Sequence, residues 1–144
     1  MRKLSCYHEE NTYCTLFIIT IGFLLTACQS PPVQRYGSVI GLHEDKLEEY
    51  KALHADTWPE VLAVLKEYNI QNYSIYLTKF DNGQYYLFSY LEYTGTDVAA
   101  DFDKIAQAPI TKKWWELTDP MQIPLKSREA GEHWKNMEEV FHME

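Results

Sequence analysis

Two closely spaced runs, Tyr73-Ser74-Ile75-Tyr76-Leu77 and Tyr85-Tyr86-Leu87-Phe88-Ser89-Tyr90-Leu91, decide the fold. Both are rich in aromatic and aliphatic residues, which is typical of β-strands. The loop between them contains Asp81-Asn82-Gly83, and glycine supplies a backbone angle that other residues resist. The sequence therefore predicts a β-hairpin. Because successive side chains alternate across a strand, Tyr73 and Tyr76 are expected on opposite faces.

An amphipathic helix is predicted before this hairpin. Glu44 and Asp45 place negative charge in its first turn, which suits the positive end of the helix dipole. Pro59 has no N–H and disfavours helical geometry at Trp58, so we expect a break there and a restart with Pro59 in the first turn. Residues that recur every three or four positions form one face: Leu47, Tyr50, His54, Trp58, Val61, Leu65 and Tyr68.

The remaining elements complete a recognisable order. Residues 36–42 predict a first strand, 96–106 and 109–117 predict helices, and 137–143 predict a last strand. The order β-α-β-β-α-β is a ferredoxin-like α+β pattern with the helices on one face of the sheet. The other face would remain uncovered, so a homodimer that packs two such faces together is expected.

One histidine has chemically suggestive neighbours. Tyr50 and His54 are four residues apart on the predicted helix, so their side chains lie next to each other. An imidazole exchanges protons near neutral pH, although a histidine on such a face is also common as a structural residue. Neighbouring side chains on a helix point about 100° apart, so Trp114 and Trp115 are expected to divide between the interior and a pocket wall. The other histidines of the folded part, His43, His133 and His142, are interpreted as structural. Asp56 and Glu60 are candidates to orient the imidazole, although solvated carboxylates on a helix surface are the more common explanation.

The order and spacing of several segments resemble the L-rhamnose mutarotase family over roughly residues 34–144. The resemblance rests on residues 50–61, 72–77, 114–115, 118–121 and 139–142. It implies a dimeric α+β barrel and an isomerase that interconverts the α and β anomers of a 6-deoxyhexose without a cofactor. It further implies that His54 is the catalytic acid and that Tyr50, Tyr73, Trp114 and Trp115 contact the sugar. L-Rhamnose and L-fucose both remain open as substrates.

The first residues predict a lipoprotein leader. An apolar run at 15–25 is shorter than the roughly 20 residues that span a bilayer, and it follows Arg2 and Lys3. Its end, Leu25-Thr26-Ala27-Cys28, resembles a lipobox, which implies cleavage before Cys28 and lipid on its sulfur. We therefore expect a signal peptide at 1–27, a tether at 28–35, a catalytic domain at 36–144 and a lipid-anchored location in the cell envelope. A buried helix, or a secretory signal with a chance cysteine, is the alternative.

Composition limits the other function classes. The net charge of −8 disfavours nucleic acid as a partner. The sequence has no Cys cluster and no His-Glu-x-x-His, so neither a metal site nor a cofactor is predicted. Two alternatives stay open: a monooxygenase or haem-binding protein of the dimeric α+β barrel class, and a deoxysugar-binding lipoprotein without catalytic activity.

Overall fold

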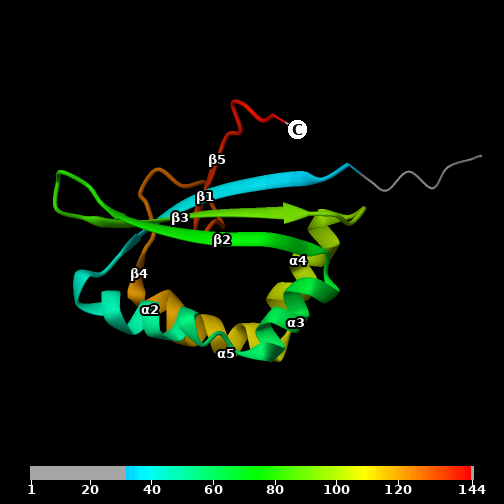
Figure 1. Cartoon of the computed structure of the whole chain (residues 1–144), viewed down its shortest axis with the longest axis horizontal. Helices are drawn as coiled ribbons and strands as arrows, with labels where there is room; N and C mark the ends of the chain where they lie inside the picture. Colours follow the sequence, from blue (N-terminus) through cyan, green and yellow to red (C-terminus); the bar gives the residue numbers. More distant parts are fainter. Residues whose placement is uncertain (1–31, 144) are drawn as a thin grey trace, which may run out of the picture. The chain divides into compact units, whose positions relative to one another are not determined.

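An antiparallel sheet with helices packed on one face forms the folded part of the chain (Figure 1). The computed structural model describes residues 32–143. The strands run β2-β3-β1-β4 across the sheet, and β5 also pairs with β1. Their bounds are β1 Gln34–Leu42, β2 Ile70–Lys79, β3 Tyr85–Tyr93, β4 Gln122–Ile123 and β5 Lys135–Met137.

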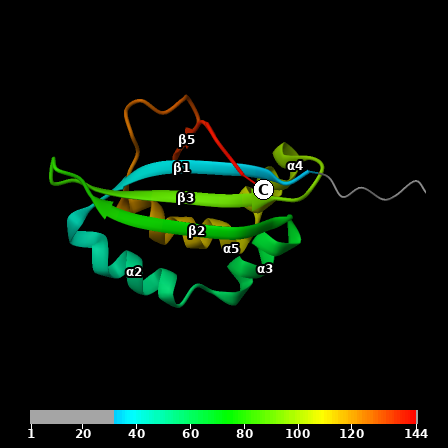
Figure 2. The ribbon, with the colours of Figure 1, turned by 45° about the horizontal axis from the view of Figure 1, so that its top comes forward.

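The helices lie between the strands in sequence, and two turns of 3-10 helix accompany them. In both views α2, α3 and α5 lie on the same side of the sheet (Figure 2). The predicted α+β fold class is confirmed. The helical segments are η1 Glu44–Lys46, α2 Leu47–Ala55, α3 Pro59–Glu67, α4 Val98–Gln107, α5 Pro109–Thr118 and η2 Asp119–Met121.

The predicted hairpin and the predicted helix break are both present. Strands β2 and β3 pair antiparallel, and Gly83 in the loop has a φ of 81°. Helix α2 ends at Ala55, and Trp58 has an extended backbone with a ψ of 129° before α3 restarts at Pro59. The proline therefore divides one amphipathic pattern into two helices, because it cannot donate the hydrogen bond that would continue the first.

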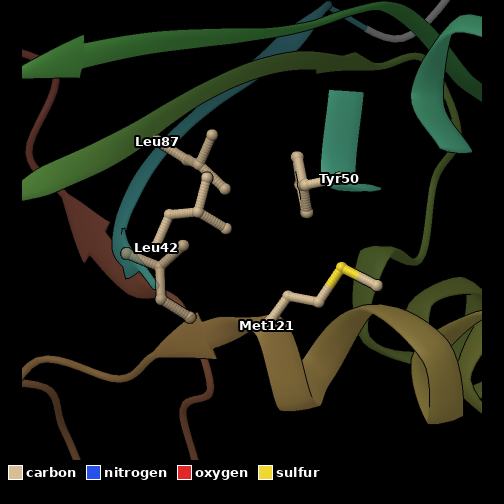
Figure 3. Packing of buried hydrophobic residues seen from close by; sticks show 5 residues of the cluster. Leu42, Tyr50, Leu87 and Met121 are labelled. Atoms are coloured by element: carbon tan, nitrogen blue, oxygen red, sulfur yellow. The ribbon is translucent and has the colours of Figure 1, made fainter. Parts of the chain in front are cut away.

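Every second side chain of the central strands faces the helices, and these side chains form the core. Ile40 pairs with Leu87 across β1 and β3, and both side chains are almost fully buried. Leu42 and Leu87 of the sheet form one cluster with Met121 of η2 and Tyr50 of α2 (Figure 3). This cluster fixes α2 and η2 against the sheet, and both elements contribute residues to the site described below.

The C-terminal strand differs from the expectation of residues 137–143. Only Lys135–Met137 pairs with β1, where Met137 lies opposite Gly37. Beyond this point Val140 is 89% exposed and Phe141 is 79% exposed. The apolar pattern that predicted a strand therefore has no surface to pack against within the described part of one copy. The two residues of β4 extend the same side of β1 and were not predicted.

Strand β2 lies at an edge of the sheet, and its register against β3 shifts between Gln71 and Ser74. Asn72 in this bulge has a φ of 49°. Such a bulge re-aims side chains near it, and Tyr73 follows directly.

Candidate active site

His54 is held in one orientation by its own helix. Its Nδ1 lies 2.9 Å from the backbone oxygen of Tyr50. A carbonyl oxygen only accepts, so Nδ1 carries the hydrogen and Nε2 is the nitrogen left for a ligand. The imidazole also stacks on the Tyr50 ring, with centroids 4.0 Å apart.

The environment of His54 makes its protonated form a stronger acid. Burial lowers the pKa of the imidazole, and the hydrogen bond to the Tyr50 carbonyl opposes this shift. The chain just beyond His54 is fixed as well, because the Thr57 hydroxyl donates to the His54 backbone oxygen at 3.0 Å. This bond satisfies one of the carbonyl groups that a helix end leaves without a partner. Neither Asp56 nor Glu60, which were expected as possible partners, bonds to the imidazole within residues 32–143.

Two tyrosines bring hydroxyl groups to the same place. Tyr50 is only 4% exposed, and burial raises the pKa of its hydroxyl, with Tyr73 adding to the effect and a hydrogen bond to Gln122 opposing it. Burial around the hydroxyl end likewise raises the pKa of Tyr73, although 43% of that residue's surface is exposed. Both hydroxyls therefore stay protonated near neutral pH and can donate hydrogen bonds.

The tandem tryptophans divide their exposure as their helical spacing suggests. Trp114 is 7% exposed, whereas Trp115 is 40% exposed. The Trp114 ring meets the His54 ring edge-on at 5.3 Å and the Trp58 ring at the same distance. Trp114 thus packs behind the imidazole, and Trp115 offers a face to solvent.

A cavity of about 350 Å³ collects these groups. Its size suits a small ligand such as a monosaccharide. All five residues singled out from the sequence line it, and nine further residues join them: Ser38, Ile75, Ser89, Leu91, Thr118, Asp119, Gln122, His133 and Trp134.

A polar corner of this cavity was missed from the sequence. His133 was interpreted as structural, but its Nε2 lies 2.8 Å from Oε1 of Gln122 and 3.6 Å from Oδ1 of Asp119. These residues come from the loop after β4, from β4 and from η2, which show no periodic pattern. The segment Thr118-Asp119-Pro120-Met121 was the available signal, since it belongs to the family resemblance.

A second cavity of about 390 Å³ adjoins the first. The two share Tyr73, Leu91, Trp114 and Trp115, and the rest of its wall is mainly apolar. No group of three or more His, Cys, Asp or Glu side chains among residues 32–143 is placed to hold a metal ion.

Comparison with known proteins agrees with this geometry. A sequence model described as L-rhamnose mutarotase matches residues 35–143. The chain belongs to the L-rhamnose mutarotase family. The L-rhamnose mutarotase of Lactiplantibacillus plantarum is 38% identical over 110 residues, which are 76% of this chain and 98% of that protein. The enzyme of Oceanobacillus iheyensis is 32% identical over 112 residues, covering 78% of this chain and 100% of that protein.

A solved structure shows the same fold in this family. The crystal structure of an L-rhamnose mutarotase from Formosa agariphila aligns with a TM-score of 0.58 and 26% identity, over 77% of this chain and 99% of that chain. The predicted family is thereby confirmed, and with it the predicted class of enzyme, an isomerase of carbohydrates.

The predicted location in the cell envelope was wrong. The family model matches residues 35–143, and the relatives from L. plantarum and O. iheyensis are covered over 98% and 100% of their own length. Those relatives therefore contain no segment that corresponds to the predicted lipoprotein leader, and they give the predicted location no support. Within residues 32–143, no helix has the length and apolar character that crossing a membrane requires. Cys28 and the expected signal peptide lie outside the described residues.

Proposed function

We propose that this chain interconverts the α and β anomers of L-rhamnose by opening and closing the pyranose ring. The observation that carries this proposal is the oriented imidazole of His54 on a monosaccharide-sized cavity with two protonated tyrosine hydroxyls and two tryptophans. Family membership supports L-rhamnose as the sugar, since the relatives are named for it. The proposed catalytic domain comprises residues 36–144.

The chemistry requires two proton transfers. Opening the ring removes a proton from the hydroxyl on C1 and delivers one to the ring oxygen, while the bond between C1 and the ring oxygen breaks. His54 is the proposed catalytic acid at the ring oxygen, and it acts from Nε2 because Nδ1 is held by the Tyr50 carbonyl. Rotation about the C1–C2 bond and reversal of the transfers then close the other anomer. No covalent intermediate is required.

The remaining cavity residues bind and orient the sugar. The hydroxyls of Tyr50 and Tyr73 are the proposed hydrogen-bond donors to sugar oxygens. The exposed face of Trp115 suits the C–H-rich surface of a deoxysugar, while buried Trp114 supports the imidazole from behind. Water-mediated mutarotation is already fairly fast, so acid–base assistance of about 10²–10⁴-fold is a sufficient contribution from the enzyme.

Saturation-transfer NMR tests this function directly. The exchange rate between the two anomeric proton signals of L-rhamnose is measured with and without protein, and we expect a marked acceleration. L-Fucose is measured in parallel, since both sugars were open from the sequence. Unchanged exchange of both sugars at stoichiometric protein would falsify the mutarotase function, and binding without acceleration would favour a non-catalytic sugar-binding protein.

We further propose that two copies pair through the face of the sheet that the helices leave open. On this face Tyr76 is 63% exposed and Phe80 is 48% exposed, and Phe80 lies against the rings of Tyr86 and Phe88. An exposed aromatic patch of this kind is a typical protein interface. Such pairing would also give Val140 and Phe141 of the C-terminal segment a surface to cover.

Sedimentation velocity at micromolar concentration tests the dimer. Tyr76→Arg should shift the protein toward monomer, because it places a charge on the proposed interface. Leu62→Arg on α3 is the matched control, since Leu62 is 44% exposed but lies on a helix away from that face. A wild-type protein that sediments as a monomer would contradict the pairing.

A further inference from the structure

The polar corner of the cavity contains a carboxylate to which no role has yet been assigned. Asp119 begins η2 directly after α5, and its side chain is 44% exposed. It lines the cavity together with His54, and it is the one carboxylate among the described lining residues. A ligand that reaches Nε2 of His54 therefore shares its cavity with this carboxylate.

The neighbours of Asp119 hold a defined arrangement. The amide oxygen of Gln122 only accepts, so Nε2 of His133 carries a hydrogen and donates it over 2.8 Å. That same nitrogen lies 3.6 Å from Oδ1 of Asp119. Gln122 is 7% exposed and its side chain also reaches the Tyr50 hydroxyl. The corner is thus connected to the tyrosine on which His54 stacks.

Ring opening needs more than one proton-transferring group. The hydroxyl on C1 loses a proton while the ring oxygen gains one, and these are different atoms of the sugar. His54 has a single nitrogen free, because the other is engaged by the Tyr50 carbonyl. The two tyrosine hydroxyls stay protonated near neutral pH, since burial raises their pKa, so neither supplies a phenolate to accept the proton. A second group is therefore required at the C1 hydroxyl.

We infer that Asp119 is this second catalytic residue, the base that accepts the proton of the C1 hydroxyl while His54 protonates the ring oxygen. This inference rests on the proposed mutarotase function. Burial raises the pKa of Asp119, and the nearby His133 opposes the shift. A raised pKa makes a carboxylate a better base, which suits the proposed role.

The proton transfers balance over one turnover. His54 starts protonated and Asp119 starts ionised. During opening, His54 gives its proton to the ring oxygen, Asp119 takes the proton from O1, the bond between C1 and the ring oxygen breaks, and C1=O1 forms. During closure, Asp119 returns its proton to O1 and His54 takes the proton of the ring-derived hydroxyl as the ring bond forms again. Both residues end as they began.

His133 and Gln122 act as positioning residues. Gln122 fixes the His133 ring through its amide oxygen, and His133 in turn places its Nε2 3.6 Å from Oδ1 of Asp119. Neither needs to touch the reacting atoms. Their substitution should lower the exchange rate more than it changes sugar affinity, since the side chains that face Asp119 lose their fixed arrangement.

Asp119→Asn tests the inference, because it preserves the shape of the side chain and removes the base. We expect anomer exchange of L-rhamnose to fall by about 10²-fold or more, with sugar affinity within about threefold of wild type. Glu116→Gln is the matched control. It neutralises a carboxylate three residues earlier on α5 that lies outside the cavity, and it should exchange anomers at the wild-type rate.

A second variant keeps the test independent of packing. Asp119→Ala should regain exchange when formate is added, measured above the protein-free reaction at the same formate concentration, because a small carboxylate can occupy the vacated space. Exchange by Asp119→Asn at the wild-type rate, a loss of affinity as large as its loss of rate, or no formate rescue of Asp119→Ala would each overturn the inference. An inactive wild type would instead refute the mutarotase function itself.

Discussion

Trp114 and Trp115 are adjacent in sequence, and the structure predicts opposite consequences for their replacement by alanine. Trp114 is 7% exposed and meets the rings of His54 and Trp58 edge-on at 5.3 Å. Removing a buried tryptophan costs about 3–5 kcal/mol in free energy of unfolding, and each lost aromatic pair accounts for about 0.5–1.5 kcal/mol of such effects. Trp115 is 40% exposed, so its truncation should cost only about 1–2 kcal/mol on the same scale.

Urea denaturation and sugar titration separate the two effects. For a domain of this size, the free energy of unfolding falls by about 1–3 kcal/mol per molar urea. The free energy lost in Trp114→Ala should therefore lower the urea midpoint by roughly 2 M. Trp115→Ala should shift the midpoint far less, weaken L-rhamnose binding in an NMR titration, and still catalyse exchange at high sugar concentration. Equal destabilisation by both variants, or unchanged sugar affinity in Trp115→Ala, would refute the assignment of one ring to packing and the other to binding.

Three further outcomes follow from the same structure. His54→Ala should stay folded and bind sugar but lose most anomer exchange in saturation-transfer NMR, and exchange at the wild-type rate would move the acid role to Tyr50 or Tyr73. Burial lowers the pKa of His54, so the contribution of its neutral ring to the free energy of unfolding should be complete above about pH 6.5. That contribution should be lost as the pH falls through the lowered pKa of the folded state. Between these two pH values, the urea midpoint of His54→Gln should therefore depend less on pH than that of the wild type. Gly95→Ala should lower the melting temperature by several degrees, because the added carbon would collide with the Tyr93 hydroxyl. That hydroxyl donates a hydrogen bond to Asp101 at 2.9 Å. An unchanged melting temperature would show that the loop moves freely.

Local patterns in the sequence determined much of the scaffold. The aromatic runs around Gly83 predicted the β2–β3 hairpin, and Pro59 predicted the division between α2 and α3. Both depend on backbone properties of nearby residues, so no distant partner was needed to infer them. The helical spacing of Tyr50 and His54 likewise predicted that the two rings would meet, and they stack at 4.0 Å. The family resemblance added the roles that spacing alone left open.

The tertiary structure alone decided which distant residues join His54. Asp119, Gln122 and His133 lie on short segments without periodicity, and they reach the cavity because β4 pairs with β1 and the following loop returns to the sheet. The last strand was misjudged for a related reason. The apolar residues Met137, Val140, Phe141 and Met143 predicted a strand, but whether a strand forms depends on a neighbour that supplies hydrogen bonds, and the pairing with β1 ends at Met137. Sequence periodicity records local geometry, whereas contacts between distant segments depend on how the whole chain packs.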